Sequence, residues 1–448
     1  MYKNRDIAAR LHSYHIETYG CQMNVRDSET IAGLLQSLGM TRAASMQEAD
    51  FILFNTCCVR DHAERRVFGN VGFTRMIKEE RPNVVIAVCG CMMQQRDVAD
   101  KLFKRFPFVD LVFGTHVLHK LPQMLDAVCA GDRLCITSEE DSGIVEGLPS
   151  LRPDGQSAFV NIMFGCNNFC SYCIVPYVRG RERSRDPERI IDEVRGLVAE
   201  GFKEITLLGQ NVNSYGKDLG LGVDFADLIR MINDIPGEFL IRFMTSHPKD
   251  ATEKLFKTMA ECEKCAHQLH LPVQSGNDRV LKAMNRNYTA EKYLAQVKLA
   301  RSYMPDLVIT TDIIVGFPGE TDEEFEDTIK LCDEVRYDAM FTFIYSKRVG
   351  TPAASMPDAA TREDKQRRFD RLLEAANRVS AEKHAEYIGK TVRVLVDGET
   401  GKDEYNLSSR TNGGRLVHLA GDKSLIGQFI DVKITSGNTW ALYGKVGE

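Results

Sequence analysis

The run Phe164-Gly-Cys-Asn-Asn-Phe-Cys-Ser-Tyr-Cys-Ile174 contains three cysteines, Cys166, Cys170 and Cys173, in the spacing CxxxCxxC. Three thiolates at this spacing can hold three irons of a cubane [4Fe–4S] cluster and leave the fourth iron without a protein ligand. Such an open iron can bind a small molecule and pass an electron to it. The alternative is a zinc knuckle, which needs a fourth Cys or His close by, and none follows Cys173 for many residues. The sequence therefore favours an iron–sulfur cluster.

With Tyr172 directly before the last cysteine, this spacing resembles the radical S-adenosylmethionine (SAM) superfamily. The resemblance implies that the open iron binds the amino and carboxylate groups of SAM. It implies further that reduction releases a 5′-deoxyadenosyl radical from SAM. The cofactors expected at this loop are therefore one [4Fe–4S] cluster and SAM.

The composition is that of an ordinary soluble protein. The chain has 448 residues, 43% hydrophobic and 27% charged, which is enough for two or three domains. Its first residues are polar, and no stretch approaches the roughly 18 apolar residues that span a bilayer, so we expect neither a signal peptide nor a membrane contact. Thirteen cysteines in such a chain indicate metal ligation or catalysis in a reducing cytoplasm. The net charge of −6 gives no global attraction to nucleic acid, so RNA binding would need local basic patches.

The first 135 residues alternate short apolar runs with amphipathic helical patterns. We expect strands at 15–19, 51–54, 84–88 and 109–113, and helices at 27–38, 63–80 and 96–106. This alternation is typical of a parallel sheet with helices on both faces. The sequence therefore predicts an N-terminal α/β domain at 13–135, followed by a polar, Gly- and Pro-bearing linker at 136–157.

From residue 158 the alternation begins again. We expect strands at 158–164, 204–208, 239–245, 267–271, 308–315 and 340–345, and helices at 187–200, 224–233, 252–260, 278–300 and 322–335. Six βα units predict a partial (β/α)6 barrel at 158–384, with a long charged helix at 361–387. Short alternating strands at 391–396, 414–419, 429–434 and 440–443 predict a small antiparallel β-barrel at 385–448. The fold class is therefore α/β, with three domains.

Three further cysteines, Cys21, Cys57 and Cys91, follow the first three expected strands. Ligands of an open α/β sheet bind outside the carboxyl ends of its strands. These cysteines could therefore meet in space and hold a second cluster. Cysteine is also a common buried residue beside strands, and the spacing alone does not decide between a second metal site and core packing.

The wider sequence resembles the methylthiotransferase family, radical SAM enzymes that replace a C–H bond by C–S–CH3. The resemblance covers essentially the whole chain and implies that the C-terminal barrel is an OB-like TRAM domain. It also implies an auxiliary [4Fe–4S] cluster on Cys21, Cys57 and Cys91. The matching motifs are Gly20-Cys-Gln-Met-Asn24, Asn55-Thr-Cys57, Gly90-Cys-Met92, Val175-Pro-Tyr-Val-Arg-Gly-Arg-Glu-Arg-Ser-Arg185, Leu208-Gly-Gln-Asn-Val-Asn-Ser-Tyr-Gly216, Leu271-Pro-Val-Gln-Ser-Gly276 and Asp312-Ile-Ile-Val-Gly-Phe-Pro-Gly-Glu-Thr321.

Two neighbouring cysteines leave alternatives open. Cys58 adjoins Cys57, and adjacent residues of an extended strand point to opposite faces. We therefore expect Cys58 to face away from a cluster that Cys57 holds. Cys89 and Cys91 are two residues apart and share a face if both lie in a strand, so only the resemblance selects Cys91.

The resemblance also implies how the cofactors are used and held. SAM acts twice, as radical source and as methyl donor, and the auxiliary cluster presents the sulfur, so both clusters serve one carbon atom. No catalytic residue beyond the cluster ligands is identified. Gly and Asn are also the usual turn residues, so strand-ending turns are the alternative interpretation of several expected SAM contacts. These contacts are Tyr172, Gly209, Gln210, Asn211, Gln274, Ser275, Gly316 and Glu320.

Residues around the first cysteine indicate the substrate. Gly20-Cys-Gln-Met-Asn24 resembles the MiaB-type tRNA methylthiotransferases, which modify N6-isopentenyladenosine at position 37, next to the anticodon. The alternatives are threonylcarbamoyladenosine in tRNA, an aspartate of a ribosomal protein and, from another class, a non-catalytic iron–sulfur RNA-binding protein. We expect a cytoplasmic monomer that binds tRNA and receives electrons from a donor such as flavodoxin or ferredoxin, with a sulfur source of unspecified kind.

Basic residues after the cysteine loop and in the last domain are candidate contacts to RNA phosphates. The alternative is that the arginines after the loop pair with Glu182, Asp186 and Glu188, and that the others are scattered surface charges. The candidates are Arg179, Arg181, Arg183, Arg185, Arg393, Arg410 and Arg415.

Three other features receive a structural interpretation. We expect no metal at Cys262 and Cys265, which lie close together on an expected helix. The charged run 365–371 is typical of a solvated helix face. His247 follows the third barrel strand and is expected to line the pocket, whereas His270 is expected to be an interior histidine.

Overall fold

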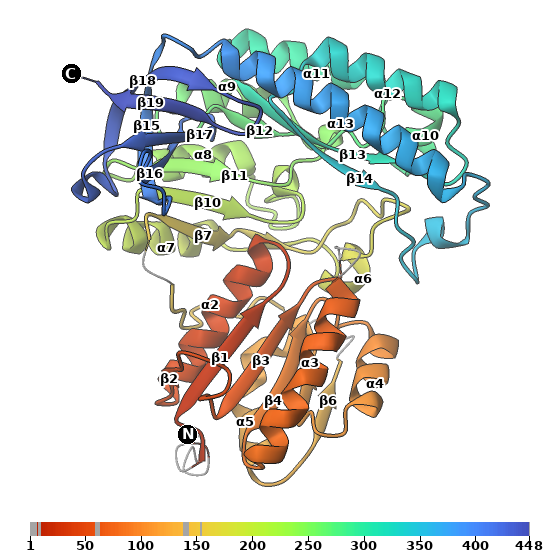
Figure 1. Cartoon of the computed structure of the whole chain (residues 1–448), viewed down its shortest axis with the longest axis vertical. Helices are drawn as coiled ribbons and strands as arrows, with labels where there is room; N and C mark the ends of the chain where they lie inside the picture. Colours follow the sequence, from red (N-terminus) through yellow and green to blue (C-terminus); the bar gives the residue numbers. More distant parts are fainter. Residues whose placement is uncertain (1–6, 8–9, 59–62, 138–142, 153–154, 448) are drawn as a thin grey trace. The chain divides into compact units, whose positions relative to one another are not determined.

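The computed structural model describes residues 7, 10–58, 63–137, 143–152 and 155–447, and it divides into two compact units (Figure 1). Unit 1 consists of Met1–Pro153, Phe164–Asn167 and Ile174–Arg183. Unit 2 consists of Asp154–Met163, Asn168–Cys173 and Ser184–Glu448. One boundary between the units falls inside the segment expected as a linker. Other boundaries fall at both ends of residues 168–173, so Ile174–Arg183, which follows the cysteine loop, belongs to unit 1.

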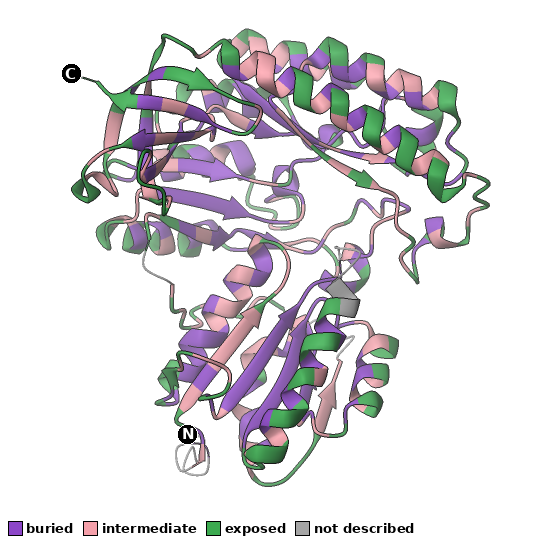
Figure 2. Cartoon of the chain, viewed as in Figure 1, coloured by how far each residue is buried: buried purple, intermediate pink, exposed green. Residues whose placement is uncertain are grey.

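Unit 1 contains a sheet of six strands in the order β2-β1-β3-β4-β5-β6. Every neighbouring pair is parallel, which confirms the expected parallel α/β domain. β3 and β4 are buried along their whole length, as central strands between two helix layers are (Figure 2). The strands are β1 (Ser13–Thr18), β2 (Thr41–Arg42), β3 (Phe51–Thr56), β4 (Val85–Gly90), β5 (Leu111–Phe113) and β6 (Leu134–Ile136).

Helices cover both faces of this sheet. One core joins the sheet to α2 and α5 through residues such as Ile31 and Leu125, and the other joins it to α3 and α4 through Val71 and Leu102. Ile174 and Val178, from the segment after the cysteine loop, pack into the second core. The helices are α2 (Gln22–Ser37), α3 (Ala63–Glu80), α4 (Arg96–Arg105), α5 (Leu121–Cys129), the 3-10 helix η1 (Thr115–Lys120) and α6 (Val175–Arg179).

Part of the expected linker packs against α2. The Leu151 N–H donates to the Glu29 carbonyl at 2.9 Å, and Leu148 packs against the core beside α2. Gly33 permits this approach, because a Cβ atom there would lie 2.5 Å from the carbonyl carbon of Pro149. The polar composition of the segment does not reveal this contact, since the contact depends on a glycine more than one hundred residues away.

Unit 2 contains six parallel strands in two groups of three, ordered β11-β10-β7 and β12-β13-β14. A bridge between Ile241 and Cys265 joins the two groups, so β7 and β14 are the edges of an open barrel (Figure 1). This arrangement confirms the expected partial (β/α)6 barrel. The strands are β7 (Ser157–Asn161), β10 (Glu204–Leu208), β11 (Leu240–Phe243), β12 (Gln268–His270), β13 (Val308–Val315) and β14 (Ala339–Ile344), and the short strands β8 (Met163–Phe164) and β9 (Arg183–Ser184) pair with each other.

The helix expected at 278–300 is wrong, because the structure has two helices there. Asn285 and Asn287 have φ of 59° and 40°, a left-handed conformation that an α-helix does not accept but that asparagine tolerates. The helices of unit 2 are α7 (Pro187–Ala199), α8 (Phe225–Asn233), α9 (Glu253–Glu261), α10 (Asp278–Ala283), α11 (Ala290–Tyr303), α12 (Asp322–Val335) and α13 (Arg362–Ala385), with 3-10 helices η2 (Val212–Ser214), η3 (Pro248–Asp250), η4 (Pro352–Ser355) and η5 (Lys423–Leu425).

The C-terminal part of unit 2 is a closed five-stranded barrel in the order β15-β16-β17-β19-β18. Four of its pairs are antiparallel, as expected, and β17 pairs with β19 in parallel. β16 was not among the expected strands. The strands are β15 (Thr391–Glu399), β16 (Leu407–Thr411), β17 (Leu416–Ala420), β18 (Phe429–Gly437) and β19 (Leu442–Val446). Among the described residues, no helix is both long and apolar enough to cross a membrane.

Candidate functional site

Cys21, Cys57 and Cys91 follow β1, β3 and β4 at one edge of the unit 1 sheet. A hydrogen bond between the thiols of Cys21 and Cys57 lowers the pKa of Cys21 to about 5. Gly20 allows this approach, because its φ is +122° and a Cβ atom there would lie 2.4 Å from the Cys57 Cβ. Cys91 is close enough for its charge to interact with that of Cys21. The structure thus brings the three cysteines together, and their role as cluster ligands stays a prediction.

Cys58 also points into this site. A hydrogen bond from its thiol is the main cause that lowers the pKa of Cys91. The strand β3 ends at Thr56, so the alternation of faces that predicted the opposite orientation does not extend to Cys57 and Cys58. The expectation that Cys58 faces away is therefore wrong.

Cys89 and Cys91 lie on opposite sides of the sheet. Cys89 packs with Val85 and Ala87 in the core that includes α2 and α5, and burial raises its pKa well above the usual value. Gly90 has a φ of +97° and turns the chain, so that Cys91 joins the core on the other side. The glycine between the two cysteines could have indicated this separation, because glycine accepts a left-handed turn at the end of a strand.

Arg179 is buried beside Cys91. Its Nε donates to the Cys91 Sγ at 3.0 Å, and its Nη2 donates to Asp27 at 2.6 Å and to the Asn24 Oδ1 at 3.1 Å. Burial disfavours the charge of Arg179, but Asp27 and Cys91 outweigh this effect and hold its pKa well above the usual value. The site therefore contains a positive charge at one cysteine sulfur and a carboxylate that balances it.

A second buried arginine, Arg286, contacts the cysteine loop within unit 2. Its Nη1 donates to the Cys170 Sγ at 3.5 Å, its Nη2 to the Pro272 carbonyl at 2.6 Å and its Nε to the Tyr288 hydroxyl at 2.8 Å. No motif or spacing predicts this contact, because Arg286 lies 116 residues after Cys170. Neither Arg179 nor Arg286 was expected from the sequence to donate a hydrogen bond to a cysteine.

Buried polar atoms gather at the carboxyl ends of the barrel strands. A buried polar atom without a hydrogen bond costs about 1–3 kcal/mol, so a set of such atoms fits a polar ligand such as SAM. Two backbone positions in the same region, Thr245 and Gln274, have φ of +69° and +72°, a strained conformation that is frequent at binding sites. Within the described residues, the buried atoms without a partner here include Asn161 Oδ1, Asn211 Oδ1, Ser246 Oγ, His247 Nε2 and Gln274 Oε1.

Some of the expected SAM contacts belong to this region. Asn211 is buried and its Nδ2 donates to Asp250 at 2.7 Å, which directs the amide. Gly209 and Gln210 precede it after β10, and a Cβ atom on Gly209 would lie 2.6 Å from the Met163 Cγ. These residues, with Gln274, are placed where a ligand at the strand ends could meet them, and SAM binding by them stays a prediction.

The other expected SAM contacts have partners within unit 2. The Ser275 Oγ lies 3.4 Å from the Thr328 Oγ1, toward α12. Glu320 accepts from the Gly316 N–H at 2.6 Å and from Arg368 at 3.3 Å, and burial raises its pKa to about 7. Glu320 therefore joins two parts of the loop after β13 and links this loop to α13. Tyr172 packs beside Phe317, Met284 and Ile314.

Three of the seven arginines expected to bind RNA are buried and held by carboxylates of this chain. Arg179 pairs with Asp27, Arg185 with Glu193 at 2.8 Å, and Arg415 with Asp338. These guanidinium groups are not on the surface. Arg393 and Arg410 are exposed and pair with Glu238 and Asp397, and Arg181 is exposed. Together with half-buried Arg183, these four remain predicted RNA contacts.

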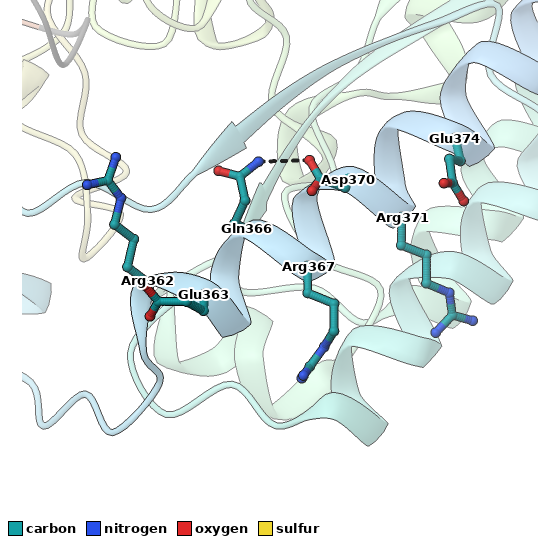
Figure 3. Close-up of a pocket in the computed structure, with 7 residues that line it drawn as sticks. All are labelled: Arg362, Glu363, Gln366, Arg367, Asp370, Arg371 and Glu374. Carbon is teal, nitrogen blue, oxygen red and sulfur yellow. Dashed lines mark hydrogen bonds between the residues drawn. The ribbon is translucent and has the colours of Figure 1, made fainter.

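A surface pocket along α13 is not a second site. Its side chains extend from one face of the helix and are spread along it (Figure 3), and the bond drawn between them joins Gln366 to Asp370 at 2.7 Å. Arg367 and Arg371 pair with Asp322 and Glu326 of α12. Gln366, Arg367, Asp370 and Arg371 are exposed, as the charge pattern predicts, whereas Arg368 of the same run is buried and pairs with Glu320.

Among the described residues, no three Cys, His, Asp or Glu side chains converge on a single metal ion. A cubane does not need such convergence, because each cysteine binds a different iron. In unit 1, several thiols lie together, and the Asp27 carboxylate nearby is bonded to Arg179. Such a sulfur-rich donor set fits an iron–sulfur cluster, because thiolates are the usual ligands of its irons.

Comparison with known proteins identifies three parts of the chain. Family models match the uncharacterized protein family UPF0004 at residues 13–114, the radical SAM superfamily at residues 160–332 and the TRAM domain at residues 385–446. Two clostridial relatives bear the name tRNA-2-methylthio-N(6)-dimethylallyladenosine synthase. The one from Clostridium perfringens is 53% identical and covers 97% of each chain, and the one from Clostridium botulinum strain Langeland is 52% identical and covers 96% of each.

Solved structures share the fold. The radical SAM methyltransferase TsrM from Kitasatospora setae, with cobalamin and a [4Fe-4S] cluster bound, aligns with a TM-score of 0.56 over 77% of this chain and 77% of that chain. At 15% identity this likeness concerns the fold alone. The identity and coverage of the clostridial relatives show that this chain belongs to the tRNA-2-methylthio-N(6)-dimethylallyladenosine synthase family, within the radical SAM superfamily.

Proposed function

We propose that this chain replaces the C2 hydrogen of N6-isopentenyladenosine (N6-dimethylallyladenosine), at position 37 of tRNA, by a methylthio group. The observation that carries the proposal is the pair of cysteine sites, in which Arg179 donates to Cys91 and Arg286 donates to Cys170. The names of the clostridial relatives support the choice of substrate. In this proposal, residues 13–135, 158–384 and 385–448 are the auxiliary-cluster, radical SAM and TRAM domains, joined by 136–157.

Each set of cysteines would hold its own cluster, Cys166, Cys170 and Cys173 the first, and Cys21, Cys57 and Cys91 the second. When bound, a [4Fe–4S] cluster with an open iron supplies an electron for SAM cleavage at the first site and a place for sulfur at the second. Two molecules of SAM are consumed in the complete reaction. One would give its methyl group to the sulfur and leave as S-adenosylhomocysteine. The other would accept one electron and divide into methionine and a 5′-deoxyadenosyl radical, which would take the substrate hydrogen and leave as 5′-deoxyadenosine.

The two buried arginines stabilise negative charge on the cysteine sulfurs. A hydrogen bond from a guanidinium to a thiolate favours the thiolate, which is the form that binds iron. Arg179 does this for Cys91, and Arg286 does it for Cys170. Both arginines also restrict the orientation of the sulfur, because each guanidinium is fixed by other partners.

The unpartnered polar atoms at the barrel strand ends would hold SAM. Asn211 and Gln274 each present a carbonyl oxygen, which suits the amino group of SAM. The His247 Nδ1 accepts from the Lys249 N–H at 3.2 Å, so its proton lies on Nε2, which is then a donor. Burial lowers the pKa of His247 to about 2, so this histidine stays neutral and donates without carrying charge.

The RNA would be bound by the TRAM domain and by exposed arginines. Arg181, Arg393 and Arg410 are exposed on the surface, where phosphates can reach them. A base inside a stacked anticodon loop has to be splayed out to reach a reactive carbon, because enzymes act on bases outside the stack. We further propose a cytoplasmic monomer that receives electrons from a small donor such as flavodoxin or ferredoxin.

The experiment that tests the proposal is nucleoside mass spectrometry of tRNA from a strain that lacks this chain. We expect 2-methylthio-N6-isopentenyladenosine to disappear, N6-isopentenyladenosine to accumulate, and the chain on a plasmid to restore the product. Unchanged 2-methylthio-N6-isopentenyladenosine in the deletion strain would rule out this substrate. A loss of methylthiolated threonylcarbamoyladenosine, or of a methylthio-aspartate in a ribosomal protein, would instead identify one of the two related substrates.

A second assay distinguishes the proposed enzyme from a non-catalytic iron–sulfur RNA-binding protein. Anaerobic reconstitution with dithionite and SAM should yield 5′-deoxyadenosine, which a binding module does not form. The absence of 5′-deoxyadenosine from a preparation with full iron content would favour the binding module.

A further inference from the structure

β14 carries two phenylalanines that the described chain leaves half exposed. Phe341 and Phe343 are 50% and 49% exposed. Residues two apart in a strand share a face, so both rings lie on the same side of β14. β14 is an edge strand of the barrel (Figure 1). Large apolar side chains that lie together on a surface mark a place where something binds.

This face is the interior of the barrel and not the side that the helices cover. On the neighbouring strand β13, Ile309, Ile313 and Val315 pack in the core with helix residues. The residues between them, Asp312 and Ile314, therefore point away from the helices. Asp312 pairs with Phe341 and Ile314 pairs with Phe343, so the two rings share the inward face.

A polar wall adjoins Phe341. The ring of His270, from β12, meets the Phe341 ring edge-on with centroids 5.7 Å apart. The His270 Nδ1 lies 2.9 Å from the Thr310 Oγ1, and its Nε2 lies 3.5 Å from the Asp312 carboxylate. The inward face is thus apolar at Phe341 on β14 and polar at Asp312 on the adjacent strand β13.

The other end of this face reaches the cysteine loop. Ile314 packs in a cluster with Phe317 and Met284, and Tyr172 packs against the same cluster. Tyr172 lies between Cys170 and Cys173 in the sequence. We call Ile314, Phe341 and Phe343 the apolar strip. It is continuous with the residues that surround two of the cysteines expected to bind the SAM cluster.

We propose that the apolar strip binds the five-carbon dimethylallyl group on N6 of the substrate adenosine, an inference that rests on the function proposed above. The group is branched, uncharged and about as long as the spacing of two residues on one face of a strand, near 7 Å. Binding would remove both phenylalanine rings from water, which is favourable for an apolar ligand alone. The adenine would then extend from the strip toward the cysteine loop.

Charge favours this occupant over the threonylcarbamoyl group of the rival substrate. A threonylcarbamoyl group carries a carboxylate, which would lose its hydration against Phe341 and Phe343. It would also meet the negative charge of Asp312, which lies beside Phe341. Unpaired buried charge is costly, so the strip should reject this substrate as well as attract the prenylated one.

The test compares three anticodon stem-loops that carry dimethylallyladenosine, unmodified adenosine or threonylcarbamoyladenosine at position 37. The variants are Phe341→Ala, Phe343→Ala and the conservative Phe343→Leu, all as reconstituted holoenzyme. Phe73→Ala, which removes an equally exposed phenylalanine (55%) from α3 in unit 1, is the matched control. Product formation gives kcat/KM, and fluorescence anisotropy under anaerobic conditions gives the affinity for each RNA.

We expect each alanine variant to lower the preference for dimethylallyladenosine over adenosine by about tenfold or more, in both kcat/KM and affinity. Phe343→Leu should recover part of the loss, and Phe73→Ala should not change the preference. An unchanged preference in both alanine variants would overturn the proposal. An equal loss for prenylated and unmodified RNA would also overturn it, because the rings would then contact the adenine. If the wild type forms no methylthio product on any RNA, the proposed function fails instead.

Discussion

Both cysteine sites contain a buried arginine, but the charge of that arginine is balanced at one site only. In unit 1, Arg179 pairs with Asp27 at 2.6 Å while it donates to Cys91. In unit 2, Arg286 donates to Cys170, to a backbone carbonyl and to a phenol, and no carboxylate of the described chain pairs with it. A buried charge without a counter-charge is unfavourable. The barrel site is therefore arranged for a negatively charged occupant, whereas the charge in the unit 1 site is already balanced.

The polar atoms of the two sites also differ in whether they have hydrogen-bond partners within the chain. In unit 1 the thiols bond in pairs, Cys21 with Cys57 and Cys58 with Cys91. In unit 2, Asn211, His247 and Gln274 present polar atoms that have no partner among the described residues. The barrel thus gains more from ligand binding, because an anionic cluster would supply the missing charge and SAM would supply the missing hydrogen bonds.

Loss of one cysteine from each site should have the largest effects, on two different activities. Cys166→Ala should abolish SAM cleavage, whereas Cys57→Ala should retain cleavage and lose sulfur insertion, because each cysteine serves a different cluster. Anaerobic assays that measure 5′-deoxyadenosine and methylthio-nucleoside in one sample check both outcomes. A fully active Cys57→Ala enzyme would remove Cys57 from the auxiliary site.

Loss of the two arginines should destabilise the metal-free protein unequally. Arg179→Met removes the partner of the Asp27 carboxylate, whose side chain is only 12% exposed, which should cost unit 1 about 3–5 kcal/mol. Arg286→Met leaves only neutral groups unpaired and should cost unit 2 about 1–3 kcal/mol. Hydrogen exchange resolved by peptide measures each unit separately. The double variant Arg179→Met/Asp27→Leu should recover much of the first loss, and equal losses for the two single variants would contradict the contrast in charge balance.

His247 should make the stability of unit 2 depend on pH. In the native state burial lowers its pKa to about 2, whereas in the unfolded chain its pKa is about 6.5. The unfolded state therefore takes up the proton first, so this contribution is complete above pH 6.5 and falls with decreasing pH, by about 2 kcal/mol at pH 5.

The measurement for His247 is hydrogen exchange of unit 2 peptides at pH 7 and pH 5, corrected for the intrinsic rate. His247→Gln should reduce the loss of stability between these pH values, and His12→Gln, at an exposed histidine of unit 1, should not. The same acid dependence in wild type and His247→Gln would show that this histidine is not neutral in the native state.

The smallest effect is expected for Cys58. A serine hydroxyl can replace its thiol in the hydrogen bond to Cys91, so Cys58→Ser should keep the iron content of the wild type. Cys91→Ser should lose the auxiliary cluster. Iron and sulfide analysis of both variants after identical reconstitution checks this difference, and loss of half the iron from Cys58→Ser would make Cys58 a ligand.

Local periodicity predicted the elements that depend on local sequence. The expected bounds of β10, β13 and α3 agree with the structure residue for residue. The break between α10 and α11 was missed because it depends on two left-handed asparagines, which a helical pattern does not register. The expected orientation of Cys58 was wrong because the orientation depends on where β3 ends, and the ends of strands are poorly marked in a sequence.

The site could be predicted only where its residues carry a motif. The cysteines follow strands and appear in recognisable runs, and the structure brings Cys21, Cys57 and Cys91 to one edge as that position suggests. Arg179 was expected to contact RNA, but it is buried against Asp27, and Arg286 gave no signal at all. Both contacts join residues more than eighty positions apart, and such pairs cannot be read from spacing.

In the proposed function, each set of three cysteines holds its own [4Fe–4S] cluster. Mössbauer spectroscopy and iron analysis of anaerobically reconstituted wild type, Cys57→Ala and Cys166→Ala test it most directly. We expect about eight irons per chain in the wild type and about four in each variant, with the remaining irons in cubane form. About four irons in the wild type, or about eight in either variant, would contradict it.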